Sequence, residues 1–213
     1  MIRNLIFDYG GVLMDLDFRQ TLIALKQLLK VDFKDETYRN WFFELFKSYE
    51  KNGISDEAFL DKLRSNSDEN PTSQELIMAW NALMISIKKE RFDMLTELKK
   101  NYGVYLLSNT NGVHYENMLL MAKDLLGPIE IDSFFHKSYY SHLVNMRKPD
   151  KEIFDLICSE NKLDRKETLF IDDLPFNVEG AIKAGLHSIQ HDPKTEITEN
   201  IHVYISRINE QLS

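Results

Sequence analysis

The stretch Leu5-Ile6-Phe7-Asp8-Tyr9-Gly10-Gly11-Val12-Leu13 delivers a single carboxylate, that of Asp8, into a double-glycine turn. Its apolar start predicts a buried strand, because a short apolar run bounded by turn residues is typical of a strand in a sheet core. Gly10 and Gly11 allow the backbone to turn sharply and to approach a ligand closely. An Asp at a strand end is often only a turn or capping residue. The role of Asp8 therefore depends on what the rest of the chain places beside it.

Length and composition are those of a globular protein. The chain has 213 residues, of which 43% are hydrophobic and 28% charged, enough for one core domain or for a core with a smaller inserted domain. Its formal net charge of −8 and the absence of a Lys/Arg block argue against nucleic acids and anionic membranes as partners. Nothing in the sequence indicates the oligomeric state.

Cysteine usage and the lack of long apolar runs bear on location. The single cysteine, Cys158, excludes an intrachain disulfide and fits a reducing compartment. We interpret it as a small buried residue on a helix. The first predicted strand starts almost at the N-terminus, and no run of about 18 apolar residues occurs anywhere. These features predict a cytoplasmic protein without a membrane segment.

Residues 16–88 predict several helices and no strand. Helical spacing of apolar residues or capping signals mark helices that begin near Leu22, Thr37, Ser55 and Thr72, the last with a capping box and a stripe through Met84. Such a helical block between the first strand and its later partners predicts an inserted domain. The expected division is a helical domain of residues 16–88 and a core of residues 1–15 and 89–213.

Asp15 and Asp17 stand immediately before the first of these helices. Both are suited to cap its N-terminus. A position near the active site is the alternative, and the sequence leaves both interpretations open.

From Arg91 onward, helices and strands alternate as in a parallel sheet with crossover helices. The segments predicted as strands are Val104–Leu107, Thr168–Ile171, Leu186–Gln190 and, more weakly, Lys137–Ser141. Helices are predicted at residues 91–100, around 118–125, at 151–159, before Gly185 and at 196–212. The fold class is therefore α/β, with a doubly wound, Rossmann-like parallel sheet.

Polar residues follow three of the apolar strands: Asp8, then Ser108-Asn109, then Asp172-Asp173. In an open parallel sheet these strand ends share one edge, where ligands bind. Adjacent acids at the end of a buried strand are costly unless a cation neutralises them. Asp8, Asp172 and Asp173 supply the oxygen ligands that Mg²⁺ takes.

An anionic group would find donors beside this cluster. Lys148 adds a positive charge, Gly10 and Gly11 expose backbone N–H groups, and Ser108 precedes a predicted helix N-terminus. The combination indicates phosphate chemistry.

Four segments in order resemble the motifs of the haloacid dehalogenase-like (HAD) hydrolase superfamily. They are Phe7-Asp8-Tyr9-Gly10-Gly11-Val12-Leu13, Leu107-Ser108-Asn109-Thr110, Arg147-Lys148-Pro149 and Phe170-Ile171-Asp172-Asp173. The helical insertion after the first motif is similar to the helical cap of the branch that contains sugar-phosphate phosphatases, phosphoglycolate phosphatases and the N-terminal domain of soluble epoxide hydrolases. The resemblance covers the core from residue 1 to about 190.

The resemblance implies a role for each motif residue. Asp8 would be the nucleophile, forming an aspartyl-phosphate, and would also bind Mg²⁺. The Gly10 carbonyl, Asp172 and Asp173 would complete the metal site, directly or through water. Ser108 and Lys148 would stabilise the transferring phosphoryl group. Substrate phosphate would contact Gly10, Gly11, Ser108, Asn109 and Lys148. The implied activity is Mg²⁺-dependent hydrolysis of a small phosphorylated metabolite, with a sugar phosphate as first candidate.

Gly10 departs from the usual phosphatase motif, in which a second acid follows the nucleophile by two residues. Loss of that proton donor costs about 10²–10⁴-fold in rate. Asp15, Asp17 or a cap residue could replace it. The alternatives are a catalytically weakened phosphate-binding protein and a 2-haloacid dehalogenase. A phospho-accepting receiver module is a further alternative, but receiver modules carry their acid pair early in the chain, whereas here the pair comes last.

The remaining functional candidates are weaker. Residues 50–55 form a turn in the helical insertion that is expected to contribute to substrate specificity. The histidines show no metal-ligand spacing and are interpreted as core or surface residues: His114, His136, His142, His187, His191 and His202. His114 and His142 are the least certain of these, because they lie near the motif loops.

Overall fold

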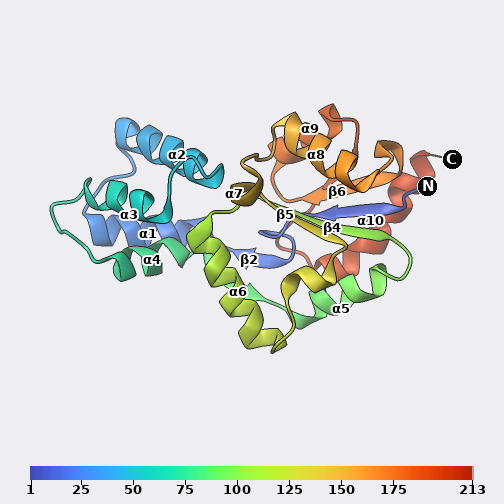
Figure 1. Cartoon of the computed structure of the whole chain (residues 1–213), viewed down its shortest axis with the longest axis horizontal. Helices are drawn as coiled ribbons and strands as arrows, with labels where there is room; N and C mark the ends of the chain where they lie inside the picture. Colours follow the sequence, from blue (N-terminus) through green and yellow to red (C-terminus); the bar gives the residue numbers. More distant parts are fainter. Residues whose placement is uncertain (213) are drawn as a thin grey trace.

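The computed structural model describes residues 1–212, which form a larger lobe built on a parallel sheet and a smaller helical lobe (Figure 1). The sheet has five strands in the order β5-β4-β1-β6-β7. These strands are β1 (Asn4–Phe7), β4 (Gly103–Ser108), β5 (Lys137–Tyr140), β6 (Thr168–Asp172) and β7 (His187–Gln190), all paired in parallel. The predicted α/β fold with a parallel sheet is confirmed.

Helices cover both faces of the sheet, because apolar side chains of the central strand point to both faces and must be buried on each. Leu5 and Phe7 belong to one apolar cluster and Ile6 to another, because successive side chains of a strand point to opposite faces. The first face is covered by α5 (Lys89–Leu98), α6 (Gly112–Leu126) and α10 (Ile197–Gln211), and the second by α8 (Lys151–Asn161) and α9 (Pro175–Lys183). The sheet is therefore doubly wound. Short elements complete the lobe: α7 (Ser141–Val144) and the 3₁₀ turns η1 (Ile131–Phe134) and η2 (Arg165–Glu167).

Strand order places the functional candidates together. β1 lies between β4 and β6, with Phe7 level with Leu106 on one side and with Ile171 on the other. Asp8 thus leaves the sheet between Ser108 and Asp172. These three positions share the carboxyl edge of the sheet, which is where open α/β sheets bind ligands.

The smaller lobe contains α1 (Phe18–Leu29), α2 (Glu36–Glu50), α3 (Asp56–Arg64) and α4 (Ser73–Asn81). Each helix begins at a capping side chain that accepts a backbone N–H, supplied by Asp17, Asp35, Ser55 and Thr72. The lobe has its own apolar core, centred on Phe42, Phe59 and Trp80, to which Val113 of α6 contributes. The four predicted helices are confirmed, and Asp17 is a helix cap.

The expectation that residues 16–88 contain no strand is wrong. α4 ends at Asn81, and β3 (Met84–Ile87) pairs antiparallel with β2 (Met14–Leu16). The Thr21 hydroxyl accepts the Leu83 N–H and donates to the Trp80 carbonyl, so it closes the helix before the predicted stripe ends. The partner strand lies about seventy residues away in sequence, so local periodicity around Leu83 did not reveal it.

Asp15 does not cap a helix. It lies in β2, where its carboxylate accepts hydrogen bonds from the Ser86 hydroxyl at 2.5 Å and from Arg91 at 2.7 Å. Arg91 is buried and also bonds Glu196, just before α10. Asp15 therefore ties the two-stranded ribbon between the lobes to the sheet lobe.

Among residues 1–212, no helix is both long enough and apolar enough to cross a membrane.

Candidate active site

Three carboxylates converge at the carboxyl edge of the sheet. Asp8, Asp172 and Asp173 each offer an oxygen atom, and these atoms lie within 4.8 Å of one another. Asp8 and Asp172 are buried, whereas Asp173 is half-buried. The convergence predicted from the strand ends is confirmed.

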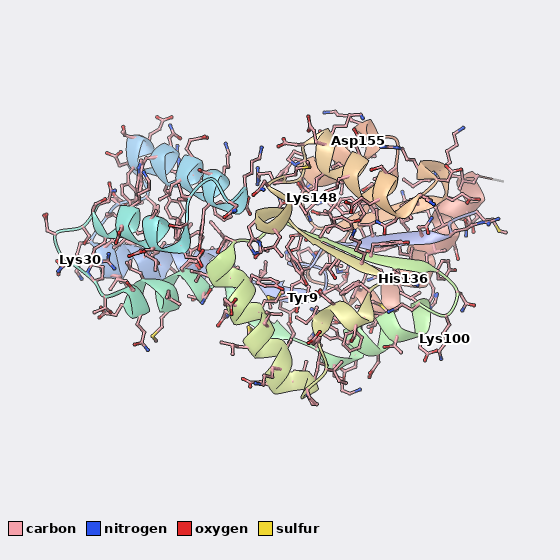
Figure 2. All side chains as sticks on the ribbon, in the orientation of Figure 1. Tyr9, Lys30, Lys100, His136, Lys148 and Asp155 are labelled. Carbon is pink, nitrogen blue, oxygen red and sulfur yellow. The ribbon has the colours of Figure 1, made fainter. Side chains whose placement is uncertain are left out.

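Lys148 is the cation of this cluster. Its side chain is 0% exposed, and its Nζ atom lies 2.8 Å from Asp8 Oδ1, 2.7 Å from Asp172 Oδ2 and 2.8 Å from the Leu107 carbonyl oxygen. These contacts use all three donors of the ammonium group. Figure 2 shows Lys148 near the junction of the two lobes, far from peripheral lysines such as Lys30. Lys148 is thus a fixed charge between the strand ends.

The protonation equilibria of the cluster reflect an excess of negative charge. Burial raises the pKa of Asp8 well above its usual range, the Asp172 charge raises it further, and Lys148 opposes both. Burial, followed by the charge of Asp172, raises the pKa of Asp173 to about 6. Burial alone would lower the pKa of Lys148, but Asp172 and Asp8 outweigh it and the pKa lies above its usual value. Three carboxylates against one ammonium suit a divalent cation with oxygen ligands.

The two acids at the end of β6 have different partners. Asp172 accepts hydrogen bonds from the Leu174 N–H at 2.9 Å, from Asn177 Nδ2 at 3.0 and 3.1 Å, and from Lys148. Both of its oxygens are therefore engaged. In the part of the chain that the structure describes, no other residue donates a hydrogen bond to the Asp173 side chain, which faces the cavity above the sheet. Asp173 is the acid that is free to bind a ligand.

Gly11 is required by the turn. Its φ is +72°, and an added Cβ would lie 2.4 Å from Asp173 Oδ2. Its N–H donates to the Met14 carbonyl at 2.8 Å, so that donor is occupied. The Tyr9 N–H donates to Asp8 Oδ1 at 2.6 Å and orients the carboxylate. Gly10 lines the cavity, and its N–H has no partner among the described residues.

The residues after β4 fix the loop that carries Lys148. Asn109 donates to the Lys148 carbonyl at 2.9 Å and accepts the Lys148 N–H at 2.9 Å, so both polar atoms of its side chain are used. The Ser141 hydroxyl accepts a hydrogen bond from the Thr110 N–H and donates one to the Thr110 carbonyl. Ser108 is buried and lines the cavity.

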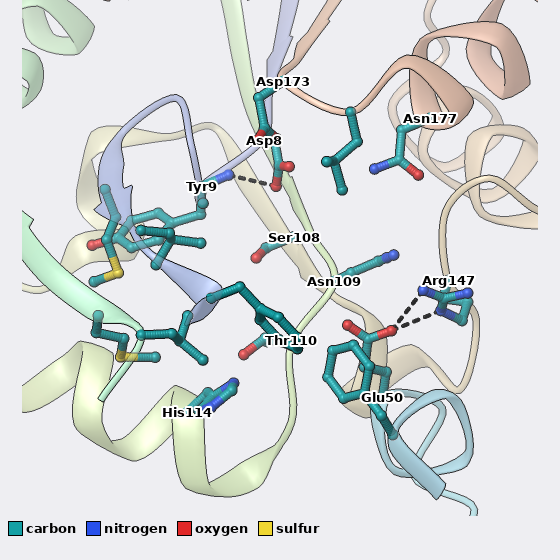
Figure 3. Close-up of a pocket in the computed structure, with 18 of the residues that line it drawn as sticks. Asp8, Tyr9, Glu50, Ser108, Asn109, Thr110, His114, Arg147, Asp173 and Asn177 are labelled. Atoms are coloured by element: carbon teal, nitrogen blue, oxygen red, sulfur yellow. Dashed lines mark hydrogen bonds and ion pairs between the residues drawn. The ribbon is translucent and has the colours of Figure 1, made fainter. Parts of the chain in front are cut away.

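A cavity of about 410 Å³ lies over these residues (Figure 3). Side chains of the smaller lobe form its far wall, among them Phe18, Phe43, Phe46 and Glu50. The Glu50 carboxylate bonds Arg147 of the Lys148 loop, with the Nη2 atom at 2.7 Å. The sequence interpretation assigned no role to Arg147 or Asn177. A signal for Asn177 was its position in the first turn of the helix after the acid pair.

Comparison with known proteins agrees with this architecture. The family model for haloacid dehalogenase-like hydrolases matches residues 5–191. This chain belongs to that family. A curated D-ribitol-5-phosphate phosphatase from Bacteroides thetaiotaomicron is 26% identical over 206 residues, covering 97% of this chain and 100% of the relative.

Two solved HAD structures are similar over nearly the whole chain. One is a HAD family enzyme from Bacteroides thetaiotaomicron in complex with magnesium and inorganic phosphate, with 30% identity, a TM-score of 0.81, and coverage of 92% of this chain and 97% of that one. The other is a predicted HAD-like family hydrolase from Porphyromonas gingivalis, with 30% identity, a TM-score of 0.84, and coverage of 96% and 98%.

Asp15 and Asp17, which the sequence suggested as replacements for the missing proton donor, do not line the cavity. Asp15 is paired with Arg91, and Asp17 caps α1 and bonds Arg19. Of the turn at residues 50–55, Glu50 is the residue that reaches the cavity. Outside the cluster at the strand ends, Glu50 is the only acid among the described cavity-lining residues.

His114 lines the cavity but its ring is fully used by the protein. Asn111 Nδ2 lies 3.0 Å from Nδ1, and the Trp80 carbonyl lies 3.1 Å from Nε2. The amide donates to Nδ1, so Nε2 carries the proton and donates to the carbonyl. The ring also stacks on Trp80, with centroids 4.7 Å apart. His114 joins the lobes as a neutral side chain.

The other histidines interpreted as core or surface residues lie as expected. His142 and His191 are buried, and burial lowers both pKa values. His202 is exposed on α10.

We expect His114 to make stability depend on pH. Burial lowers its pKa from 6.5 to about 4. Between these values the unfolded chain binds a proton that the folded protein excludes, so stability falls as pH falls. The free energy of unfolding should decrease by about 2 kcal/mol more between pH 7.5 and pH 5 in the wild type than in His114→Gln. Urea denaturation at both pH values measures this difference.

His202→Gln is the matched control, because it makes the same substitution at a histidine that is exposed on α10. Equal slopes for wild type and His114→Gln would contradict the lowered pKa of His114 in the folded protein.

Proposed function

We propose that this protein is a Mg²⁺-dependent phosphomonoesterase that acts through an aspartyl-phosphate on a small phosphorylated metabolite, with a sugar phosphate as first candidate. The observation that carries the proposal is the cluster of three carboxylates around the buried Lys148 at the base of a cavity. The HAD family match and the curated phosphatase that aligns over its full length support it.

Asp8 is the nucleophile. One of its carboxylate oxygens attacks phosphorus, the bond from phosphorus to the substrate oxygen breaks, and the released alkoxide takes up a proton from solvent water. Water then attacks the phosphorus of the aspartyl-phosphate, which regenerates the Asp8 carboxylate and releases orthophosphate. Tyr9 N–H and Lys148 hold Oδ1 and leave Oδ2 without a donor among the described residues.

Lys148 and Ser108 serve the phosphoryl group. Lys148 offsets the repulsion between the Asp8 carboxylate and an incoming phosphate dianion. Ser108 offers its hydroxyl, and Gly10 offers its free N–H. Asn109 positions Lys148 through the paired hydrogen bonds to its backbone, and Gly11 shapes the turn.

The metal ligands would be Asp8, the Gly10 carbonyl and Asp173. When bound, Mg²⁺ neutralises charge on the nucleophile and on the phosphate. Asp172 orients Lys148, because its oxygens are already engaged by Asn177, Leu174 and Lys148. A contribution of Asp172 to the metal site would pass through water.

The smaller lobe is the cap domain, with the expected division at residues 16–88. Phe43, Phe46 and Glu50 of α2 line the cavity, which supports a role of this lobe in enclosing the substrate. We also propose a cytoplasmic location, in keeping with the buried, unpaired Cys158.

The test is a panel of small phosphate monoesters assayed for orthophosphate release with Mg²⁺ and with EDTA. We expect turnover of sugar phosphates with Mg²⁺ and its loss in EDTA. Turnover that persists in EDTA would contradict the metal requirement. Chloride release from a 2-haloacid in EDTA would support a dehalogenase instead, and phosphate binding without any turnover would support a binding protein weakened by Gly10.

A further inference from the structure

Glu50 presents an unused hydrogen-bond acceptor to the cavity. It lies at the end of α2 and is 4% exposed. Its Oε2 atom accepts from Arg147 Nε at 2.8 Å and lies 2.7 Å from Nη2. No residue in the described chain donates to Oε1. Figure 3 shows this oxygen on the side of the carboxylate that faces Thr110 and Ser108.

Because Glu50 lines the cavity, Oε1 is open to a hydrogen-bond donor placed there, and a ligand group can complete it. Arg147 already neutralises the charge of Glu50, so a neutral donor such as a hydroxyl suffices. The surrounding wall is apolar, formed largely by Phe18, Phe43 and Phe46. Such a site suits a molecule that carries both hydroxyl groups and C–H faces.

The pair lies away from the phosphoryl end of the cavity. In Figure 3, Ser108 and Asn109 lie between Asp8 and the Glu50–Arg147 pair. Burial raises the pKa of Glu50, and the charge and hydrogen bonds of Arg147 oppose that rise, but a place away from the phosphoryl end does not suit proton transfer to the leaving group there. Contact with the distal part of a substrate therefore fits Glu50 better than proton transfer to the leaving group.

We propose that Glu50 is a specificity-determining residue that accepts a hydrogen bond from a hydroxyl of the substrate, at the end distant from the phosphate. The substrate is then a phosphate monoester of a small polyhydroxy alcohol, with its C–H faces against the aromatic wall. This inference rests on the proposed function, because it assigns the phosphate to the Asp8 end.

The test compares D-ribitol 5-phosphate with n-pentyl phosphate, which has the same carbon count and phosphate but lacks the hydroxyls. In Glu50→Gln, the amide oxygen must turn to Arg147, since the NH₂ group cannot accept a hydrogen bond. The cavity then meets a donor in place of an acceptor. We expect kcat/KM for D-ribitol 5-phosphate to fall about 10- to 100-fold and that for n-pentyl phosphate to stay within about twofold.

Lys51→Gln is the matched control. Lys51 follows Glu50 and makes an exposed ion pair with Asp150, so it bridges the same elements outside the cavity. It should leave the ratio of the two substrates unchanged. An equal loss for both substrates in Glu50→Gln, or no loss for either, would overturn the assignment. A loss that is larger for n-pentyl phosphate would also overturn it and indicate proton donation, because the n-pentyl alkoxide is the more basic leaving group and depends more on a proton donor.

Measuring the binding of substrate to inactive variants tests the role of Glu50 independently of catalytic turnover. Calorimetric titration of D-ribitol 5-phosphate into Asp8→Asn and into Asp8→Asn/Glu50→Gln should show about 10-fold weaker binding to the double variant. Equal affinities overturn the role of Glu50 whether or not the wild type turns substrate over. If Glu50→Gln does not fold, the wild type decides: a preference of less than about 10-fold for D-ribitol 5-phosphate over n-pentyl phosphate contradicts the proposal.

Discussion

Asp8→Asn is expected to abolish phosphate release, lowering kcat by a factor of about 10⁴ or more, as loss of a catalytic nucleophile does in hydrolases. The amide cannot attack phosphorus and binds Mg²⁺ poorly. The folded state should not suffer, because the substitution removes one of three clustered carboxylates that repel one another. We therefore expect the free energy of unfolding without Mg²⁺ to stay equal or to rise. Orthophosphate release and urea denaturation measure the two effects.

Asp93→Asn is the control for Asp8→Asn, because Asp93 is an exposed acid on α5 that pairs with Lys89. It should keep full activity. Residual turnover above about one percent in Asp8→Asn, with the protein folded, would exclude Asp8 as the nucleophile.

Lys148→Met is expected to abolish activity and also to destabilise the fold. The substitution leaves Asp8 and Asp172 buried without their cation, a change that costs about 3–5 kcal/mol when one partner of a buried ion pair is removed. The rate should fall about 10³-fold, because the phosphoryl group loses its fixed positive charge. Lys148→Met should lower the free energy of unfolding, whereas Asp8→Asn should not. This difference would show that the net charge of the cluster, and not the loss of a side chain as such, determines the change in stability.

Lys151→Met provides the comparison for Lys148→Met, since Lys151 is exposed and, within residues 1–212, pairs with Asp155 on its own helix. Its effects on stability and rate should be small. Mg²⁺ should recover part of the stability lost in Lys148→Met by supplying positive charge to the same carboxylates. A Lys148→Met protein as stable as the wild type without Mg²⁺ would show that the cluster is not charged as described.

Much of the site could be predicted because each motif carries its own local signal. An apolar run that ends in an acid marks a buried strand and its carboxyl end, and this holds for Asp8 and for Asp172-Asp173 alike. Helices and strands that alternate imply a parallel sheet, and a parallel sheet brings such ends to one edge. The predicted convergence of the three acids followed from these rules.

Other residues could not be assigned locally. Glu50 ends an aromatic amphipathic helix, where an acid is an ordinary solvent-facing residue, and its burial arises from docking against Arg147. Asp15 looked like a helix cap, because its actual partner Arg91 lies far along the chain. β3 was missed for the same reason.

The sequence by itself determined the family, the α/β sheet, the four helices of the smaller lobe and the acids and lysine at the strand ends. These depend on periodicity, capping and turn chemistry, which act within a few residues. Only the tertiary structure decided that Asp172 is saturated while Asp173 is free, that His114 is a locked neutral side chain, and that Glu50 completes the cavity. The physical reason is that hydrogen-bond occupancy and desolvation depend on which distant groups meet, and that pairing is settled only when the lobes pack.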